Sequence, residues 1–244
     1  MELSKRLRAV ADMVTAGNRV ADVGCDHGFV SIYLYEQGIA PRVYAMDVRK
    51  GPLARAKEHI AAAGLDAYIE TRLSDGVSAL LPGEADTLIC AGMGGKLMAR
   101  ILSDGADKVK CMRELVLQPQ SELGFFREFL RLNGYGIVQE NMIKEDGKFY
   151  PMMRAVPEDK IPHADGRVPC HVACFGEDPE GWQRREDLFG PFLLREKNPV
   201  LRDFFAVCLS RNEKILAGLN RDRNAERIEE LEREQEDIRA CLLL

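Results

Sequence analysis

The chain has 244 residues, a formal net charge of −5 and an ordinary globular composition. This length allows one α/β domain of about 150 residues with a smaller appended unit. A small negative charge gives no attraction of the whole protein to nucleic acid, so any RNA contact requires a local basic patch. No apolar run reaches the roughly 18 residues that a membrane-spanning helix needs, and the basic N-terminus lacks the apolar core of a signal peptide.

The seven cysteines are scattered along the chain in no disulfide-framework spacing. Their odd number and their apolar surroundings favour reduced thiols in a cytoplasmic protein. Cys170, His171 and Cys174, with His163 nearby, suggest part of a metal site. The chain has no set of four ligands at ordinary zinc spacing, and the two cysteines fit one face of a strand, so we expect no metal.

Strand-like and helix-like segments alternate over the first 156 residues. Ser4 is positioned to cap a first helix, and the apolar segment Val20–Val23 predicts the first strand. The segments that follow are helix 29–37, strand 42–46, helix 51–63, strand 67–73, strand 85–90, helix 96–103, strand 114–117, helix 122–133 and a hairpin of strands 136–143 and 149–156. This alternation predicts a mostly parallel, doubly wound Rossmann-like sheet in an α/β domain, with the hairpin as an antiparallel edge.

The alternation ends in a segment rich in proline and glycine. We therefore predict a catalytic domain over 1–160, a linker over 161–182 and a helical unit over 183–244. Two apolar stripes that are out of phase with each other flank residues 218–224 in the last unit. They predict two antiparallel helices folded as a coiled-coil-like hairpin.

Residues 20–28 (VADVGCDHG) carry the most specific local pattern. A buried strand is followed by a turn between Gly24 and Gly28 and then by a helix, as in nucleotide-binding α/β units. A dinucleotide fingerprint requires a glycine where this chain has Asp26. A carboxylate would repel a pyrophosphate but attract a cationic ligand. The turn therefore indicates a cationic or zwitterionic nucleoside, for which S-adenosylmethionine is the obvious candidate.

Further polar residues follow the other expected strands, at the sheet edge where ligands of open α/β sheets bind. Asp47 is placed to accept hydrogen bonds from ribose hydroxyls, and Asp75 to accept one from an adenine amine. An NAD-dependent oxidoreductase would also use Asp47, but this chain lacks the glycine-rich turn that binds a pyrophosphate. A protein that uses this fold as a scaffold without any cofactor is a further alternative. The expected cofactor-binding residues are Asp22, Gly24, Cys25, Asp26, His27, Gly28, Asp47, Ser74, Asp75, Gly76, Ala91, Gly92, Met93 and Gly94.

The chain resembles the bacterial tRNA adenine-N1 methyltransferases of the TrmK type, which modify adenine 22 of tRNA with S-adenosylmethionine. The resemblance rests on residues 3–7 (LSKRL), 21–24 with the Asp26-His27 pair, 91–95 (AGMGG), 117–119 (LQP), 145–148 (EDGK), 190–193 (GPFL) and 196–198 (EKN). It implies a Rossmann-like catalytic domain, a C-terminal helical hairpin and tRNA as partner. Residues 170–189 are longer than we expect for the family, which leaves the shape of the domain junction open.

The chemistry of N1 suits these residues. N1 of neutral adenine has a free lone pair and needs no strong base, but base pairing hides it, so the target must be unpaired or flipped out. A carboxylate nearby would stabilise the positive charge that develops on the ring. Asp26 is the first candidate, although it could instead hold the cofactor's ammonium group. The expected catalytic residues are Asp26, Gly92 and Met93, and weaker substrate candidates are Lys5, Arg6, Arg8 and Lys148.

We therefore predict an S-adenosylmethionine-dependent tRNA (adenine-N1)-methyltransferase that is cytoplasmic and monomeric, with a dimer as the alternative. Two other hypotheses stay open. A methyltransferase of the same fold would act on a small molecule, and its helical hairpin would then serve another purpose such as dimerisation. A non-catalytic RNA-binding module would retain only a vestigial pocket, and calorimetry with S-adenosylmethionine would separate it from the other two.

Overall fold

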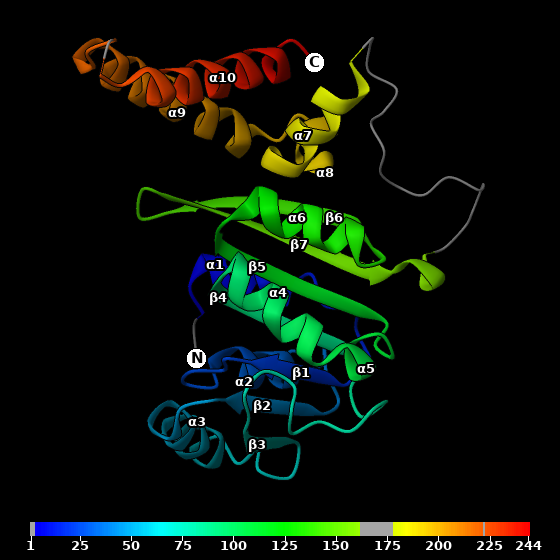
Figure 1. Cartoon of the computed structure of the whole chain (residues 1–244). Helices are drawn as coiled ribbons and strands as arrows, with labels where there is room; N and C mark the ends of the chain where they lie inside the picture. The colour runs from blue at the N-terminus through cyan, green and yellow to red at the C-terminus, as the bar shows by residue number, and fades with distance from the viewer. Residues whose placement is uncertain (1–2, 162–177, 222) are drawn as a thin grey trace.

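The computed structural model describes residues 3–161, 178–221 and 223–244, in which seven strands form one sheet of order β3-β2-β1-β4-β5-β7-β6 (Figure 1). The first five strands are parallel, and β7 and β6 are antiparallel additions. This confirms the predicted Rossmann-like sheet. The strands are β1 (Val20–Val23), β2 (Val43–Asp47), β3 (Ile69–Leu73), β4 (Thr87–Gly94), β5 (Glu114–Ser121), β6 (Tyr135–Glu145) and β7 (Lys148–Pro157).

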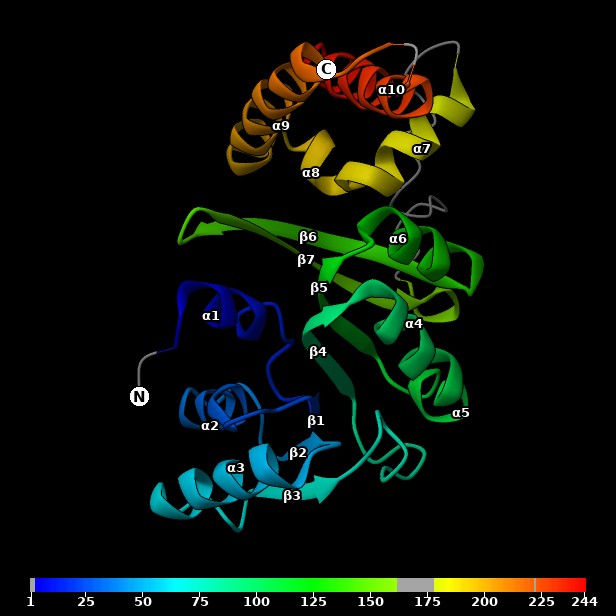
Figure 2. The same cartoon turned by 60° about the vertical axis from the view of Figure 1, so that its left-hand side comes forward.

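Helices cover both faces of the sheet, as Figure 2 shows. One face carries α1 (Lys5–Ala11), α2 (Phe29–Glu36) and α3 (Lys50–Ala62), and the other carries α4 (Gly95–Asp104), α5 (Ala106–Val109) and α6 (Leu123–Leu132). Ser4 caps α1 as predicted, since its side chain accepts a hydrogen bond from the Leu7 amide. Each face buries its own apolar cluster, so the sheet is the shared middle layer of two cores.

Strand β4 is longer than the sequence predicts. The expected strand ends at Cys90 and is followed by a glycine turn, but β4 continues to Gly94. Pairing with β5 extends over Met93 opposite Pro119 and Gly94 opposite Ser121, with register shifts between the paired positions. The glycines therefore form an irregular end of a strand, which β5 holds in place because it also runs past its predicted end.

The predicted hairpin forms, and its second strand is the inner one. β7 pairs antiparallel with β5, with Leu115 opposite Ala155, and β6 becomes the sheet edge. The turn between them contains Asp146 and Gly147, both with positive φ. Lys148 is exposed beside this turn, opposite Glu145 in the register.

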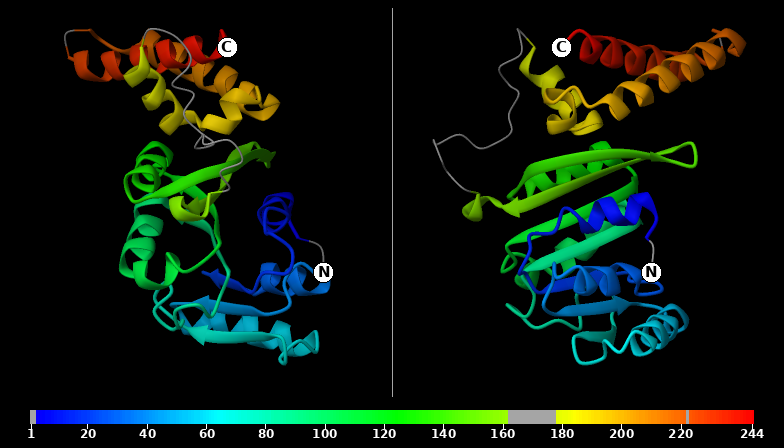
Figure 3. Two further views of the ribbon diagram at one scale, coloured as in Figure 1. Left: turned by 90° about the vertical axis from the view of Figure 1, so that its right-hand side faces the viewer. Right: turned by 180° about the vertical axis from the view of Figure 1, so that it is seen from behind.

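The described C-terminal residues form α7 (Pro179–Phe189), α8 (Pro191–Arg195), α9 (Pro199–Gly218) and α10 (Ala225–Leu242). Helix α7 begins inside the range predicted as linker, because Asp178 caps it and Pro179 suits a first helical position. Most of that predicted linker, with His163, Cys170, His171 and Cys174, lies outside the described residues. α9 and α10 are joined by a short connection and pack on each other (Figure 3); the coiled-coil character stays a prediction.

A buried ion pair joins the C-terminal helices to the sheet. Arg127 of α6 donates from Nε to Glu140 of β6 at 2.9 Å, and both side chains are at most 2% exposed. Arg127 Nη1 also donates to the carbonyls of Asp187 and Leu188 at the end of α7. The second oxygen of Glu140 accepts a hydrogen bond from the Phe192 amide of α8 at 2.9 Å. We call these residues the Arg127–Glu140 junction.

Candidate active site

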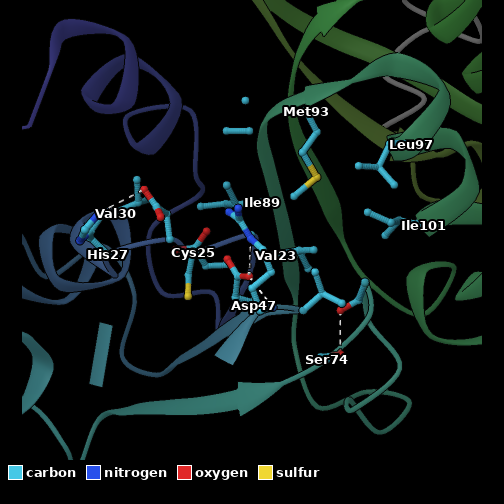
Figure 4. Close-up of a pocket in the computed structure, with 18 of the residues that line it drawn as sticks. Val23, Cys25, His27, Val30, Asp47, Ser74, Ile89, Met93, Leu97 and Ile101 are labelled. Carbon is cyan, nitrogen blue, oxygen red and sulfur yellow. Dashed lines mark hydrogen bonds and ion pairs between the residues drawn. The ribbon is translucent and has the colours of Figure 1, made fainter. Parts of the chain in front are cut away.

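A cavity of about 480 Å³ opens at the carboxyl ends of β1, β2 and β4 (Figure 4). This is the place and the size expected for a ligand site in an open α/β sheet. Its lining combines four carboxylates with apolar side chains from both faces of the sheet. Of the residues predicted from the sequence, it contains Arg6, Asp22, Gly24, Cys25, Asp26, His27, Asp47, Ser74, Asp75, Gly76, Ala91, Gly92 and Met93.

The backbone conformation of Gly24 favours glycine, and its missing side chain leaves room for the end of Met93. The φ of Gly24, 74°, lies in the left-handed region, and an added Cβ would lie 2.2 Å from Cε of Met93. Met93 points from β4 into the cavity, and its sulfur lies 3.5 Å from the Cys90 sulfur. The strand end at β1 and the irregular end of β4 therefore face each other closely across the site.

Asp22 forms part of the cavity floor and is 4% exposed. Burial raises the pKa of its carboxyl to about 6, against the hydrogen bond that Ser31 donates at 2.7 Å. Burial likewise raises the pKa of the neighbouring Cys25 thiol, which disfavours a thiolate there. The floor therefore holds a carboxyl group that gains from a cationic ligand, and it holds no activated nucleophile.

Asp47 ends β2 and is also 4% exposed. Its Oδ1 accepts a hydrogen bond from the Arg49 amide at 2.8 Å, which fixes the carboxylate at the cavity wall. Asp75 follows β3 and pairs with Arg100 of α4 at 2.9 Å, with both side chains about half exposed. Ser74 instead donates to the Gly76 carbonyl and accepts from the Ala79 amide, so its hydroxyl shapes the loop.

Asp26 occupies the left-handed region with a φ of 50°, at the turn between β1 and α2. Its side chain is 58% exposed and lies 3.7 Å from Nε2 of His27. The His27 ring stacks with Phe29, and Phe29 stacks with His59 of α3 at a centroid distance of 4.9 Å. The turn therefore presents an accessible carboxylate beside a wall of stacked rings.

Arg6 reaches the cavity from α1. Its Nη1 donates to Oε1 of the buried Gln118 at 2.8 Å, and its guanidinium lies over the ring of Tyr150. The N-terminal helix and the hairpin thus meet at the rim of the site.

Some of the predicted site residues lie outside the cavity lining and contact other parts of the protein. Gly28 packs on Ala56 of α3, where an added Cβ would lie 3.2 Å from the alanine Cβ, and Gly94 packs on Ser121. Neither residue lines the cavity. Among the weaker substrate candidates, Lys5, Arg8 and Lys148 also lie outside the lining, and Arg8 is an exposed partner of Asp12.

The sequence analysis missed lining residues from the strands β1, β4 and β5 as well as from helices and loops. They are Leu7, Val23, Val30, Val48, Arg49, Ile89, Leu97, Arg100, Ile101 and Gln120. Leu97 and Ile101, one turn apart on α4, face the cavity from the side opposite α2 (Figure 4). The spacing of four residues on a predicted helix was the available signal, but it does not distinguish a cavity wall from ordinary core packing.

In the parts of the chain that the structure describes, no cluster of three or more metal-ligating side chains is present. No described helix is long and apolar enough to cross a membrane.

The Methyltransferase domain family matches residues 3–153, which span all of β1 to β6 and most of β7. The sheet and its cavity are therefore those of a methyltransferase. The match therefore covers the whole cavity lining and ends before the C-terminal helices.

Relatives identify the particular family. The tRNA (adenine(22)-N(1))-methyltransferase of Bacillus subtilis is 32% identical over 95% of this chain and 93% of its own length. The crystal structure of the B. subtilis m1A22 tRNA methyltransferase TrmK superposes with a TM-score of 0.80 at 31% identity, covering 98% of both chains. A Streptococcus pneumoniae protein crystallised with S-adenosyl-L-methionine gives a TM-score of 0.82 at 30% identity, covering 99% of this chain and 100% of the other. The chain belongs to the tRNA (adenine(22)-N(1))-methyltransferase family.

Proposed function

We propose that this protein transfers a methyl group from S-adenosyl-L-methionine to N1 of an adenine in tRNA, at position 22 as in its relative. The observation that carries the proposal is the acidic cavity of about 480 Å³ at the carboxyl ends of β1, β2 and β4. This cavity lies within the region that matches the Methyltransferase domain family. We further propose that the protein acts as a cytoplasmic monomer.

The residues of the cavity fit this cofactor. Asp47 engages Oδ1 with the Arg49 amide, and no described residue donates a hydrogen bond to its Oδ2, so an acceptor is available for ribose hydroxyls. The carboxyls of Asp22 and Asp26 suit the positive charges of a sulfonium and an ammonium group. Asp75 at the end of β3 suits an adenine amine. The apolar wall of Met93, Leu97 and Ile101 suits the flat apolar parts of the ligand.

S-adenosyl-L-methionine supplies an activated methyl group on a sulfonium centre. The residues of the chain hold and orient the reacting groups, and positioning of this kind supplies a large part of the acceleration of such displacements. Asp26 provides a negative charge at the rim of the cavity, for one of two roles: stabilising the positive charge that develops on the adenine ring, or holding the cofactor's ammonium group. No described side chain has to remove a proton from N1, because the neutral ring carries none there.

The direct test is an incubation of the purified protein with labelled S-adenosyl-L-methionine and unmodified tRNA, followed by nucleoside analysis. We expect 1-methyladenosine. A methylated base other than 1-methyladenosine would contradict the proposed function.

The role of Asp26 is tested by Asp26→Asn, which keeps a residue tolerant of positive φ and removes the charge. If the carboxylate stabilises the charged ring, kcat falls by about a hundredfold while the affinity for the cofactor stays unchanged. If it holds the cofactor's ammonium group, the affinity measured by calorimetry falls instead. Asp146→Asn is the matched control, since Asp146 also has a positive φ of 49° but lies in the hairpin turn. Full turnover by Asp26→Asn excludes both roles.

A further inference from the structure

Gly92 lies between two side chains that come within van der Waals distance of the place where a Cβ of its own would be. A Cβ added to Gly92 would lie 3.5 Å from Nη1 of Arg6 and 3.5 Å from Nε2 of Gln120. All three residues line the cavity. We call the space between them the Gly92 slot. A larger residue at position 92 would fill the slot and would also be strained by the φ of 77°.

The two side chains that border the slot differ in whether their polar groups are free to bind a ligand. Arg6 is fixed, because Gln118 accepts its hydrogen bond at 2.8 Å and the Tyr150 ring lies beneath its guanidinium. Gln120 is exposed, and its carboxamide makes no hydrogen bond with any residue that the structure describes. Gln118 carries the same group two residues earlier, but it is fully buried and bonded to Arg6 and to the Pro119 carbonyl. Of these two amides, only Gln120 is therefore free to contact a ligand in the cavity.

Methyl transfer to N1 limits which edge of the adenine the enzyme can recognise by hydrogen bonds. The N1 lone pair is used in the reaction, so it cannot also accept a hydrogen bond from the protein. The neighbouring Hoogsteen edge remains, with the N6 amine as donor and N7 as acceptor. A carboxamide matches this edge with two hydrogen bonds, since its oxygen accepts from N6 and its nitrogen donates to N7.

We propose that Gln120 selects the target adenine by a bidentate contact with its Hoogsteen edge in the cavity beside Gly92. This proposal rests on the proposed function. Guanine presents O6 and N7, which are both acceptors, so the carboxamide oxygen would face a second oxygen. Gln120 therefore acts as a specificity-determining residue that leaves N1 free to react.

The test compares two synthetic tRNAs in competition, one with adenine and one with 7-deazaadenine at the target position. The second base has a C–H in place of N7. The wild-type protein should prefer adenine because only adenine completes the contact. Gln120→Leu makes neither hydrogen bond, so its ratio measures the intrinsic reactivity of the two bases. We expect the wild-type ratio to exceed that of Gln120→Leu by about tenfold in favour of adenine.

Gln120→Glu should reverse the preference. A carboxylate still accepts from N6, but it repels the N7 lone pair, and the C–H of 7-deazaadenine removes that repulsion. We expect this variant to favour 7-deazaadenine by several fold relative to Gln120→Leu. Gln139→Glu is the matched control because Gln139 is exposed on β6 outside the cavity, and it should keep the wild-type ratio.

Equal ratios for the wild type and Gln120→Leu would overturn the role of Gln120, even with full methylation of tRNA. Absence of any methylation of the adenine substrate by the wild type would instead overturn the proposed function. If Gln120→Glu is inactive on both RNAs, the comparison of Gln120→Leu with the wild type still decides the proposal.

Discussion

The active-site cavity and the Arg127–Glu140 junction differ in whether their buried charged groups have partners within the protein. At the junction, both side chains are at most 2% exposed, and each also bonds to backbone groups of α7 or α8. In the cavity, the buried Asp22 has no cationic partner among the described residues, the Arg49 guanidinium lies 3.8 Å from Asp47, and the half-exposed Asp75 pairs with Arg100 at 2.9 Å. The junction satisfies its charges internally and fixes two parts of the molecule together. The cavity leaves the buried carboxyl of Asp22 without a cationic partner from the protein, and this burial costs folding free energy.

Removing one partner of the junction should have the largest effect on stability. Glu140→Ala leaves the Arg127 charge buried without its partner and frees the Phe192 amide. We expect the free energy of unfolding, measured in denaturant, to fall by about 3–5 kcal/mol. Glu230→Ala is the control, because it breaks an exposed pair with Arg227 on α10 and should cost less than about 0.5 kcal/mol.

A second variant separates charge from packing at the junction. Replacing both partners, as in Arg127→Met with Glu140→Leu, should recover part of that loss, since no unpaired charge remains although the Phe192 amide and the carbonyls at the end of α7 lose their partners. An equal loss in the single and double variants would contradict the view that the unpaired charge is the main cost.

The pH dependence of the free energy of unfolding tests whether the buried Asp22 carboxyl in the cavity destabilises the folded protein when it is ionised. The pKa of Asp22 is raised from 3.8 to about 6 by burial, so the folded state binds this proton more tightly than the unfolded chain does. The resulting stabilisation is complete below about pH 4 and is lost as the pH rises through 6. Relative to Asp22→Asn, the wild type should lose about 2.4 kcal/mol between pH 4 and pH 7. Parallel curves for the two proteins would show that Asp22 carries no such cost.

The smallest expected effect concerns binding alone. Asp47→Asn keeps the oxygen that accepts from the Arg49 amide but removes the charge and one acceptor. We expect the Kd for S-adenosyl-L-methionine, measured by calorimetry, to rise about tenfold. The free energy of unfolding should change by less than about 1 kcal/mol. A large loss of stability with unchanged affinity would place Asp47 with the junction residues, as a structural group.

The two regions also differ in how well the sequence predicts them. The residues of the cavity floor lie at the carboxyl ends of buried strands, and parallel strands end at one edge of the sheet, so the sequence predicts that Asp22, Gly24 and Asp47 meet. The helices α7 and α8 and the pair of Arg127 with Glu140 were not predicted. Their contacts join segments that are far apart in the chain, and local sequence patterns do not predict such long-range contacts.

Within the cavity, prediction failed where tertiary contacts decide the structure. The residues from Ala91 to Gly94 were predicted as a turn because of their glycines, but pairing with β5 keeps them in a strand. Gln120 was missed for the same reason, since it lies past the predicted end of β5. Gly28 follows a nucleotide-binding pattern, but the contact it allows in the structure is with Ala56 of α3.

The position of β7 between β5 and β6 has a consequence for synthesis of the chain on the ribosome. The outer edge of β5 pairs with β7, so its backbone groups have no partner in the sheet until residues 148–157 have been made. Unpaired strand edges promote association with other chains. The parallel part of the sheet is therefore exposed at one edge while the following forty or so residues emerge. Completion of the hairpin closes that edge, and it also brings Tyr150 to Arg6 of the first helix.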